Sequence, residues 1–235
     1  MNISGKKAVV FGGTSGIGLA TTQMLADGGA TVIAISRDPS KAGALPANVT
    51  IQSCDVRDKV AVEALLNKLG QIDILVSAAT GGDRAIGPFL EMDMDGYKSS
   101  FDKLWGYANV VRYGARNVLD GGSITLVSGA PARNPRPGQI ALSSVGSAVE
   151  AMVRAVASEV APRIRINVVS PGVIDTPMMP VKGAEREVIY DKMTKNNLIP
   201  RAGTPDEVAE GVMFVIRNGF VTGTTVDVDG GSLLT

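Results

Sequence analysis

Glycines at a strand-to-helix junction are the first residues of this chain whose types and spacing could do chemistry. In the stretch VVFGGTSGIGLA they stand at Gly12, Gly16 and Gly18, between an apolar strand-like run and a helical pattern. Glycine lets the chain turn tightly and brings bare backbone up to a phosphate, and a helix N-terminus adds free N–H groups. This spacing predicts a dinucleotide-binding loop that also includes Thr14, Ser15 and Ile17. The alternative is a turn whose glycines only allow close packing.

The tip of the second predicted strand indicates which dinucleotide the loop would hold. Sites for NAD usually end this strand with Asp or Glu, which binds the ribose 2′-hydroxyl. This chain has ISRDP instead, with Ser36 and Arg37 at the tip. Because a guanidinium can pair with a 2′-phosphate and stack on adenine, we predict NADP(H) rather than NAD(H). Arg37 could instead be a solvated loop charge, and Asp38 opposes a phosphate unless it points away or caps the turn before Pro39.

Composition excludes several kinds of site. The 235 residues contain no His and a single cysteine, Cys54, so an intrachain disulfide and every Ser–His or Cys–His triad are excluded and a metal site is not expected. Lys plus Arg and Asp plus Glu both number 23, and the one short basic cluster is Arg133 with Arg136, which argues against a nucleic-acid partner. The N-terminal stretch MNISGKKAVVFGG is too weakly apolar for a signal peptide or membrane span, so we expect a soluble, cytoplasmic protein.

Short apolar runs alternate along the chain with longer amphipathic segments. The runs are rich in β-branched residues, as expected of parallel strands covered on both faces, and span residues 7–11, 30–36, 49–53, 72–77, 123–128, 164–170 and 224–228. Helical patterns cover residues 15–27, 58–69, 95–119, 140–161, 184–194 and 205–217. The last begins with a capping box formed by Thr204 and Glu207 around Pro205. The alternation predicts an α/β fold, a doubly wound parallel sheet of Rossmann type in three αβα layers, as one domain over residues 1–235.

These motifs resemble the short-chain dehydrogenase/reductase superfamily over nearly the whole chain. GGTSGIG is similar to its cofactor loop, with Phe11 where Thr is usual, and RAGTPDEVAEGVMFVI and FVTGTTVDVDGG resemble its last helix and strand. CDVRD, residues 54–58, resembles its adenine-contacting segment, which implies contacts from Asp55 and Val56.

Two further segments carry the resemblance toward the nicotinamide. IDILVSAAT is similar to the family's fourth strand, but its Asn-Asn-Ala-Gly is replaced by Ser77, Ala78, Ala79 and Thr80. IRINVVSPGVIDTPM is similar to the segment at the nicotinamide end, which implies contacts from Pro171, Gly172, Ile174 and Thr176.

The family's chemistry uses a tetrad of Asn, Ser, Tyr and Lys, and the resemblance assigns other residues to all four positions. PGQIALSSVGSAVEAM aligns without gaps, which puts Leu142 at the Tyr position and Gly146 at the Lys position. Counting back puts Gly129 at the Ser position, directly after Ser128. FDKLWGY puts Lys103 at the Asn position.

A lysine exchanged between two helices could restore the proton chemistry. Gly146 removes a long side chain and Lys103 adds one, so we hypothesise that the Lys103 ammonium fills the space left at Gly146. With a reference pKa of about 10.4, this group could donate to a developing alkoxide or amine, whereas service as a base would need a lowered pKa. Ser128 could orient the substrate. Lys103 and Ser128 are the predicted catalytic residues, and reduction is the expected direction. The alternatives are that Lys103 is a surface charge and that Ser128 serves merely as a hydrogen-bond partner for backbone groups at the strand end.

Several other polar residues are candidates with a simpler alternative. Tyr107 and Tyr190 are the other candidate phenols. The alternative for Tyr107 is that it packs against a neighbouring side chain and has no catalytic role. Ser143 and Ser144 are expected to cap the helix that begins near residue 140. Asp83 and Arg84 could bind a polar substrate or be solvated loop residues.

The segment over residues 177–200 is where the family closes over its substrate. Its inner face is expected to be apolar, formed by Met178, Met179, Ile189, Tyr190 and Met193. We therefore expect an NADP(H)-dependent oxidoreductase that reduces a C=O, C=N or activated C=C of a small apolar or aromatic substrate. A catalytically degenerate NADP(H)-binding protein and a non-redox cyclase or isomerase stay open. The resemblance implies a homotetramer or homodimer, and no nucleic-acid or membrane partner is expected.

Overall fold

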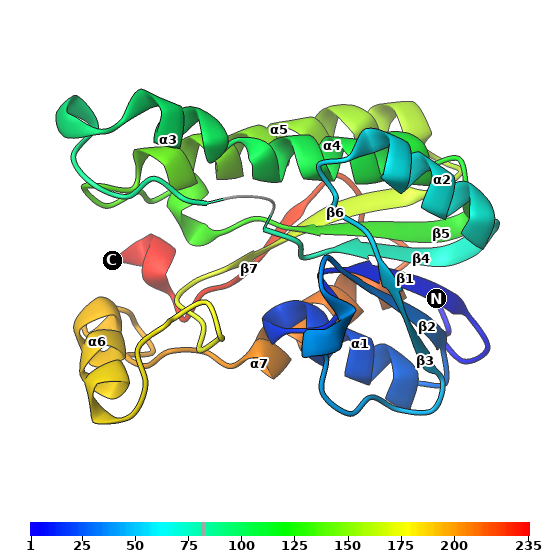
Figure 1. The fold of residues 1–235 in the computed structure, drawn as a ribbon, viewed down its shortest axis with the longest axis horizontal. Coiled ribbons are helices and arrows are strands. Elements are labelled where there is room, and N and C mark those ends of the chain that lie inside the picture. Colours follow the sequence, from blue (N-terminus) through cyan, green and yellow to red (C-terminus); the bar gives the residue numbers. More distant parts are fainter. Residues whose placement is uncertain (81–82) are drawn as a thin grey trace.

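Seven strands form one parallel sheet at the centre of the molecule. The computed structural model describes residues 1–80 and 83–235. The strands are β1 (Lys7–Phe11), β2 (Thr31–Ser36), β3 (Val49–Ser53), β4 (Ile72–Ser77), β5 (Val118–Val127), β6 (Arg165–Pro171) and β7 (Thr225–Val228). They lie in the order β3-β2-β1-β4-β5-β6-β7, and every neighbouring pair is parallel (Figure 1). The predicted doubly wound sheet is confirmed, because the chain builds outward from β1 in one direction and from β4 in the other.

Helices cover both faces of this sheet and complete the three layers. On one face lie α2 (Lys59–Leu69), α4 (Asp102–Gly114) and α5 (Ile140–Val160), and on the other lie α1 (Gly16–Asp27) and α7 (Pro205–Arg217) (Figure 1). Successive side chains of β1 alternate between the two cores: Val9 and Phe11 face the first set of helices, Ala8 and Val10 the second. Burial on both faces explains why the strands read as nearly continuous apolar runs.

Helix α5 is apolar and long enough, by length and composition, to cross a membrane. Its residues Val149, Val153 and Ala157 are instead buried in the first core, together with Ile166 and Val168 of β6. The apolar character of α5 therefore reflects its place against the sheet.

The single helix predicted over residues 95–119 is wrong. The structure has α3 (Met94–Ser99), then α4, and then β5. The hydroxyls of Ser99 and Ser100 both donate to the carbonyl of Gly96, at 3.0 and 2.9 Å, and such local bonds compete with helix propagation. After α4 the chain turns, and Val118 pairs with Ile72 of β4. The same shift makes β5 begin five residues before the predicted strand over residues 123–128.

The carboxyl ends of the parallel strands meet at one edge of the sheet, where several long connections also gather. One of them contains α6 (Ala184–Thr194), which lies apart from the sheet in Figure 1 and has its predicted bounds. The C-terminal segment returns to this edge, because the side-chain amide of Asn134 donates to the carbonyls of Ser232 and Thr235 at 2.9 and 3.1 Å. The loop after β5 and the chain's last residues are therefore neighbours.

Helix α7 begins at the predicted capping box. The Thr204 hydroxyl accepts from the Glu207 amide at 3.2 Å, and the Glu207 carboxylate accepts from the Thr204 amide at 2.8 Å. Val208, Val212 and Ile216 follow at helical spacing and are fully buried against the sheet. The cap therefore fixes the start of a helix that supplies much of the second core.

We predict that Thr204→Ala lowers the free energy of unfolding by about 1 kcal/mol, because it leaves a helix N–H without its acceptor. Urea denaturation measures this, and Thr204→Ser, which keeps the hydroxyl, is the control. Equal denaturation midpoints for the Ala variant and the wild type would contradict the assignment.

Candidate active site

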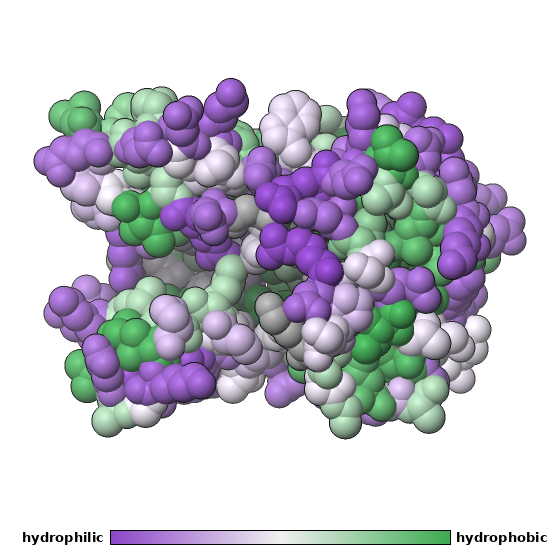
Figure 2. All heavy atoms as spheres, viewed as in Figure 1, coloured by the Kyte–Doolittle hydropathy of each residue, from purple (hydrophilic) through white to green (hydrophobic). Residues whose placement is uncertain are grey.

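A cleft of about 780 Å³ opens at the carboxyl edge of the sheet. Figure 2 shows the molecule hollowed on the side where α3 and α6 project, with hydrophobic residues on both lips. Lys103 and Ser128 line this cleft, as do all the predicted cofactor residues except Asp55 and Ser77. Its volume lies in the usual range for ligand sites. The structure thus brings together residues that are spread over most of the sequence.

The glycine loop forms a cradle that leaves no room for a side chain at Gly12 or Gly18. Gly12 has φ of +77°, and a Cβ there would lie 2.8 Å from the backbone nitrogen of Ala79 in the segment after β4. A Cβ at Gly18 would collide with the carbonyl oxygen of Gly12. Ser15, the N-cap of α1, makes no side-chain cap bond, and the first turn holds no acidic residue. The N–H groups of that turn are therefore suited to an anion such as a pyrophosphate.

The end of β2 presents Arg37 to the same cleft. Ser36 also lines it, and the Ser36 hydroxyl is held by the backbone of Asp38 at 3.3 Å. The Asp38 carboxylate accepts from the Ser40 amide at 3.2 Å and caps the short 3₁₀ turn that begins at Pro39. Of the two roles considered for Asp38, the structure shows the cap of this turn, and Arg37 lines the cleft. A contact between the Arg37 guanidinium and a 2′-phosphate stays a prediction.

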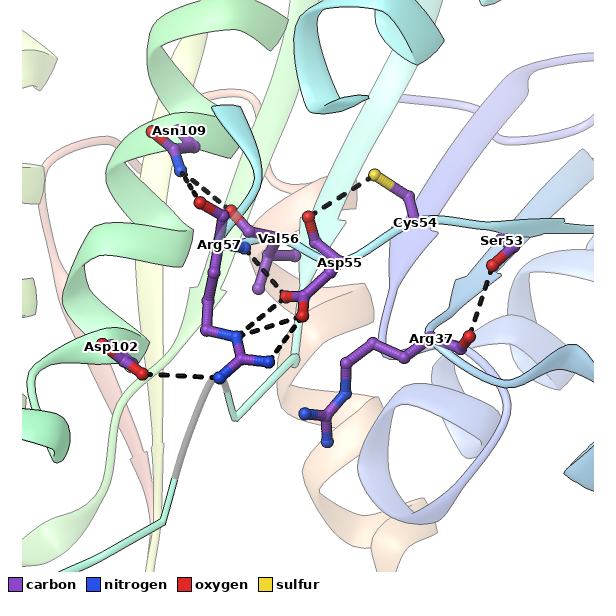
Figure 3. A network of polar contacts seen from close by, with 8 residues as sticks. All are labelled: Arg37, Ser53, Cys54, Asp55, Val56, Arg57, Asp102 and Asn109. Carbon is purple, nitrogen blue, oxygen red and sulfur yellow. Dashed lines mark hydrogen bonds and ion pairs between the residues drawn. The ribbon is translucent and has the colours of Figure 1, made fainter. Parts of the chain in front are cut away.

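Two predicted cofactor residues lie outside the lining. The Asp55 carboxylate is held by the guanidinium of Arg57, with Nε at 3.1 Å from both oxygens and a second nitrogen at 2.7 Å (Figure 3). This bond is the main reason that the pKa of Asp55 lies below its ordinary value. Ser77 is fully buried, and its hydroxyl has no hydrogen-bond partner among the described residues. Side-chain contacts from Asp55 and Ser77 to a cofactor stay predictions, while Val56 does line the cleft.

Lys103 projects from α4 into the cleft, and its ammonium donates to the backbone carbonyl of Ser128 at 3.2 Å. The ammonium also lies 5.5 Å from the centre of the Tyr107 ring. Desolvation, helped by the positive charge of Arg84, lowers the pKa of Lys103 to about 7. The Lys103 amine therefore exchanges its proton near neutral pH, which the sequence could not indicate.

The hypothesis that the Lys103 ammonium fills the space left at Gly146 stays a prediction. A Cβ at Gly146 would begin 2.9 Å from the Ala132 methyl and 3.3 Å from the Ser128 hydroxyl. Lys103 thus reaches Ser128, the residue that borders Gly146, while Ala132 closes the space beyond Gly146. Leu142 and Gly146 both line the cleft, so the face of α5 nearest the cleft is without a proton donor at either position.

The two candidate phenols, Tyr107 and Tyr190, are both engaged in hydrogen bonds. Tyr107 is buried, and its hydroxyl donates to the carbonyl of Val127 at 2.9 Å, while burial raises the pKa of Tyr107. Tyr190 lines the cleft and donates to Asp175 at 3.2 Å. The expectation that Ser143 and Ser144 cap α5 is wrong, because the N-cap is Gln139 and both serines lie inside the helix. Among the described residues that line the cleft, Lys103 is the titratable one with a hydrogen bond to Ser128.

Behind Ser128 lies a buried carboxylate that sequence reasoning missed. The Ser128 hydroxyl, 6% exposed, donates toward Glu150 at 3.3 Å and the Gly146 carbonyl at 3.4 Å. Glu150 is 4% exposed and pairs with Arg133 at 3.4 Å, and Arg133 also binds Asp227 of β7. The Ser128 hydroxyl therefore directs its one proton toward these two buried acceptors, which leaves its lone pairs for a ligand. One signal for Glu150 was available: it is the first charged residue of the apolar helix that begins at Ile140.

The covering segment contributes Met178, Met179, Tyr190 and Met193 to the lining, but not Ile189. Arg186 of α6 fastens the first part of this segment. Its guanidinium binds the Asp175 carboxylate and the carbonyls of Thr176, Met179 and Val181, at 2.8 to 3.0 Å for the carbonyls. Arg186 also stacks on the Tyr190 ring at 5.3 Å. We refer to these contacts as the Arg186 clasp; the sequence offered no signal for it.

Comparisons with known proteins agree with this geometry. A family model described as enoyl-(acyl carrier protein) reductase matches residues 12–232. The chain is 34% identical to 3-oxoacyl-(acyl-carrier-protein) reductase FabG of Thermotoga maritima, with all of both chains covered. It is also 34% identical to the cyclic-di-GMP-binding biofilm dispersal mediator protein of Escherichia coli, with 97% of each chain covered. A small-chain dehydrogenase crystallised in complex with NADPH has a similar fold, with a TM-score of 0.83 and 28% identity over 99% of this chain and 100% of the other.

The agreement extends over the whole chain. The matched family region begins at Gly12 of the cradle and ends at Ser232, beside the cleft. The parallel sheet and the glycine loop lie within it. The chain therefore belongs to the short-chain dehydrogenase/reductase family of NAD(P)H-dependent oxidoreductases.

Proposed function

We propose that this protein is an NADP(H)-dependent reductase in which Lys103 replaces the family's usual proton donor. The observation that carries the proposal is the desolvated Lys103 amine, held at Ser128 inside the cleft. The cradle around Gly12 and Gly18 would hold the pyrophosphate, Arg37 the 2′-phosphate, and the residues from Pro171 to Thr176 the nicotinamide end. NADPH, when bound, supplies the hydride.

Lys103 has the properties of a general acid or base at neutral pH. Efficient proton transfer needs a pKa near the working pH, and the pKa of Lys103 is lowered to about 7. The sequence favours reduction, because an ordinary lysine would be a poor base. That reason does not hold for this lysine, which can give a proton in reduction and accept one in oxidation. The reductive direction is supported instead by the similarity to a reductase, the Thermotoga maritima protein, and not by the pKa of Lys103.

Ser128 would position the substrate rather than supply the proton. Because its hydroxyl proton points toward Glu150 and Gly146, Ser128 faces the cleft as a hydrogen-bond acceptor. The substrate atom beside it would carry a proton, as a protonated imine or the product alcohol does. This favours a protonated C=N group, since the oxygen of a C=O group gains such a proton only as the alcohol forms. The methionines of the covering segment suit an apolar or aromatic body.

Two alternatives have specific support. A protein that binds NADP(H) without turnover would fit Leu142 and Gly146 at the tetrad positions, and the Escherichia coli relative is named for ligand binding. A non-redox cyclase or isomerase could use the same cleft and Lys103. NADPH consumption with ketones, imines and activated enones separates a reductase from both alternatives. Product formation without NADPH consumption would favour the cyclase or isomerase. Assembly as a homodimer or homotetramer and a cytoplasmic location stay predictions.

We predict that Lys103→Met lowers kcat by about a hundredfold or more, because positioned acids contribute at least that much. The wild-type kcat/KM for reduction should fall about tenfold per pH unit above pH 7, as the amine loses its proton before substrate binds. Lys103→Arg should abolish this decline, because a guanidinium stays protonated. Steady-state kinetics at saturating NADPH measure both effects.

The matched control for this experiment is Lys98→Met, which removes an exposed lysine from α3, outside the cleft. It should leave kcat and the pH profile unchanged. An unchanged kcat in Lys103→Met, with NADPH still bound, would refute the role of Lys103.

We predict that Arg37→Ala weakens NADPH binding by about ten- to a hundredfold, the usual worth of a hydrogen bond to a charged group. NADH lacks the 2′-phosphate, so its affinity should change little. Cofactor fluorescence titration measures both constants, and Arg37→Lys should give an intermediate loss for NADPH. Equal losses for the two cofactors would contradict the 2′-phosphate contact.

A further inference from the structure

The charges that line the cleft are all of one sign. Among the described residues, its lining contains Arg37, Arg84, Lys103 and Arg136 but no Asp or Glu. The chain as a whole has a formal net charge of zero, so this composition is a local feature of the cleft. Charges of one sign in a low-dielectric cleft attract ligands of the opposite sign. The cleft is therefore built for anions, and its ligands should carry the balancing charge.

The proposed cofactor accounts for only part of this positive charge. Arg37 stands at the predicted 2′-phosphate position, and the N-terminus of α1 faces the pyrophosphate. Arg136 is bound to two neutral acceptors, the carbonyl of Met193 at 2.8 Å and the side chain of Asn197 at 3.4 Å. Arg84 and Lys103 both line the cleft, and Arg84 contacts Met178 of the covering segment.

Arg84 has the poorest partner of these cations. In the part of the chain that the structure describes, its guanidinium donates to the thioether sulfur of Met178 at 3.1 Å and forms no ion pair with a carboxylate. A thioether is a weak acceptor, and a guanidinium offers five donors. Asp83, next in the chain, lines a separate outer cavity with Arg84 but does not line the cleft. Arg84 thus borders both spaces and has donors left for a ligand.

We propose that the substrate carries a carboxylate, which Arg84 binds at the mouth of the cleft while the apolar part of the substrate lies against Met178, Met179 and Met193. The proposal rests on the proposed function, because it assumes that NADP(H) fills the rest of the cleft. The planar guanidinium matches a carboxylate through two parallel hydrogen bonds. A single guanidinium also balances the single charge of a carboxylate, whereas a phosphate dianion would need further donors.

The carboxylate would also act on Lys103. A negative charge placed at Arg84 offsets the repulsion between the Arg84 and Lys103 cations, which line the same cleft. The groups that face the Lys103 amine are Arg84, the Tyr107 ring and the Ser128 carbonyl, and none of them carries a negative charge. Substrate binding would therefore favour the protonated form of Lys103, the form that donates in reduction.

Calorimetric titration of the NADP⁺-saturated protein tests the proposal without turnover. The probes are 2-naphthoate and 2-naphthamide, which have nearly the same shape and differ in charge. The wild type should bind the carboxylate about tenfold or more tightly than the amide, and Arg84→Met should lose this preference. Arg84→Lys should keep part of it. Arg154→Met, which removes an exposed arginine from α5 outside the cleft, should keep all of it.

The outcomes separate this inference from the proposed function. If the wild type does not bind NADP⁺, the proposed function fails. If NADP⁺ binds and the wild type shows no preference for 2-naphthoate, including no binding at all, only the present inference is overturned. Retention of the full preference in Arg84→Met also overturns it, as does a loss confined to NADP⁺ affinity, which would make Arg84 a cofactor contact.

Discussion

The parallel pairing of seven strands is the constraint on which the rest of this molecule depends. It forces every carboxyl end to the same edge, so that segments far apart in the sequence share one small volume. Lys103 from α4 meets Ser128 after β5, and the turn after β1 meets the backbone that follows β4. Glycine is needed at position 12 because the turn after β1 and the backbone at Ala79 approach so closely that no side chain fits between them. A cofactor cleft is thus the natural product of the strand order.

Desolvation then decides what the polar groups at that edge can do. Most cations of the chain are exposed or paired with carboxylates, as Arg57 is with Asp55. Lys103 is different, because among the described residues its amine contacts a carbonyl oxygen and an aromatic ring but pairs with no carboxylate. A charge in such surroundings is costly, so the amine gives up its proton more easily than an exposed lysine does. The same burial that packs α4 against the sheet therefore creates a group with proton chemistry at neutral pH.

Much of the fold and part of the site could be predicted from the sequence because the signals are local. The glycine loop, the strands and the capping box at Thr204 each occupy a few consecutive residues. The family resemblance was enough to name Lys103 and Ser128 separately, whereas the hydrogen bond between them came from the structure. The break at Ser99 and Ser100 was missed because apolar periodicity continues through it. The link from Glu150 through Arg133 to Asp227 was missed because 94 positions separate Arg133 from Asp227. The conclusion that Asp55 is turned toward Arg57, and the position of Ala132 beside Gly146, likewise required three-dimensional packing.

The Arg186 clasp has a consequence for how a ligand enters. One guanidinium holds four acceptors between Asp175 and Val181, so these contacts share a donor instead of each having its own. Residues 175–181 therefore cannot be released one at a time, because displacement of the Arg186 side chain breaks the contacts to all four acceptors together. Entry of a bulky molecule would then require α6 and residues 175–181 to move together as one rigid unit. Its hinges would fall outside the clasp, before Asp175 and after Thr194, and the opening rate would reflect one cooperative event.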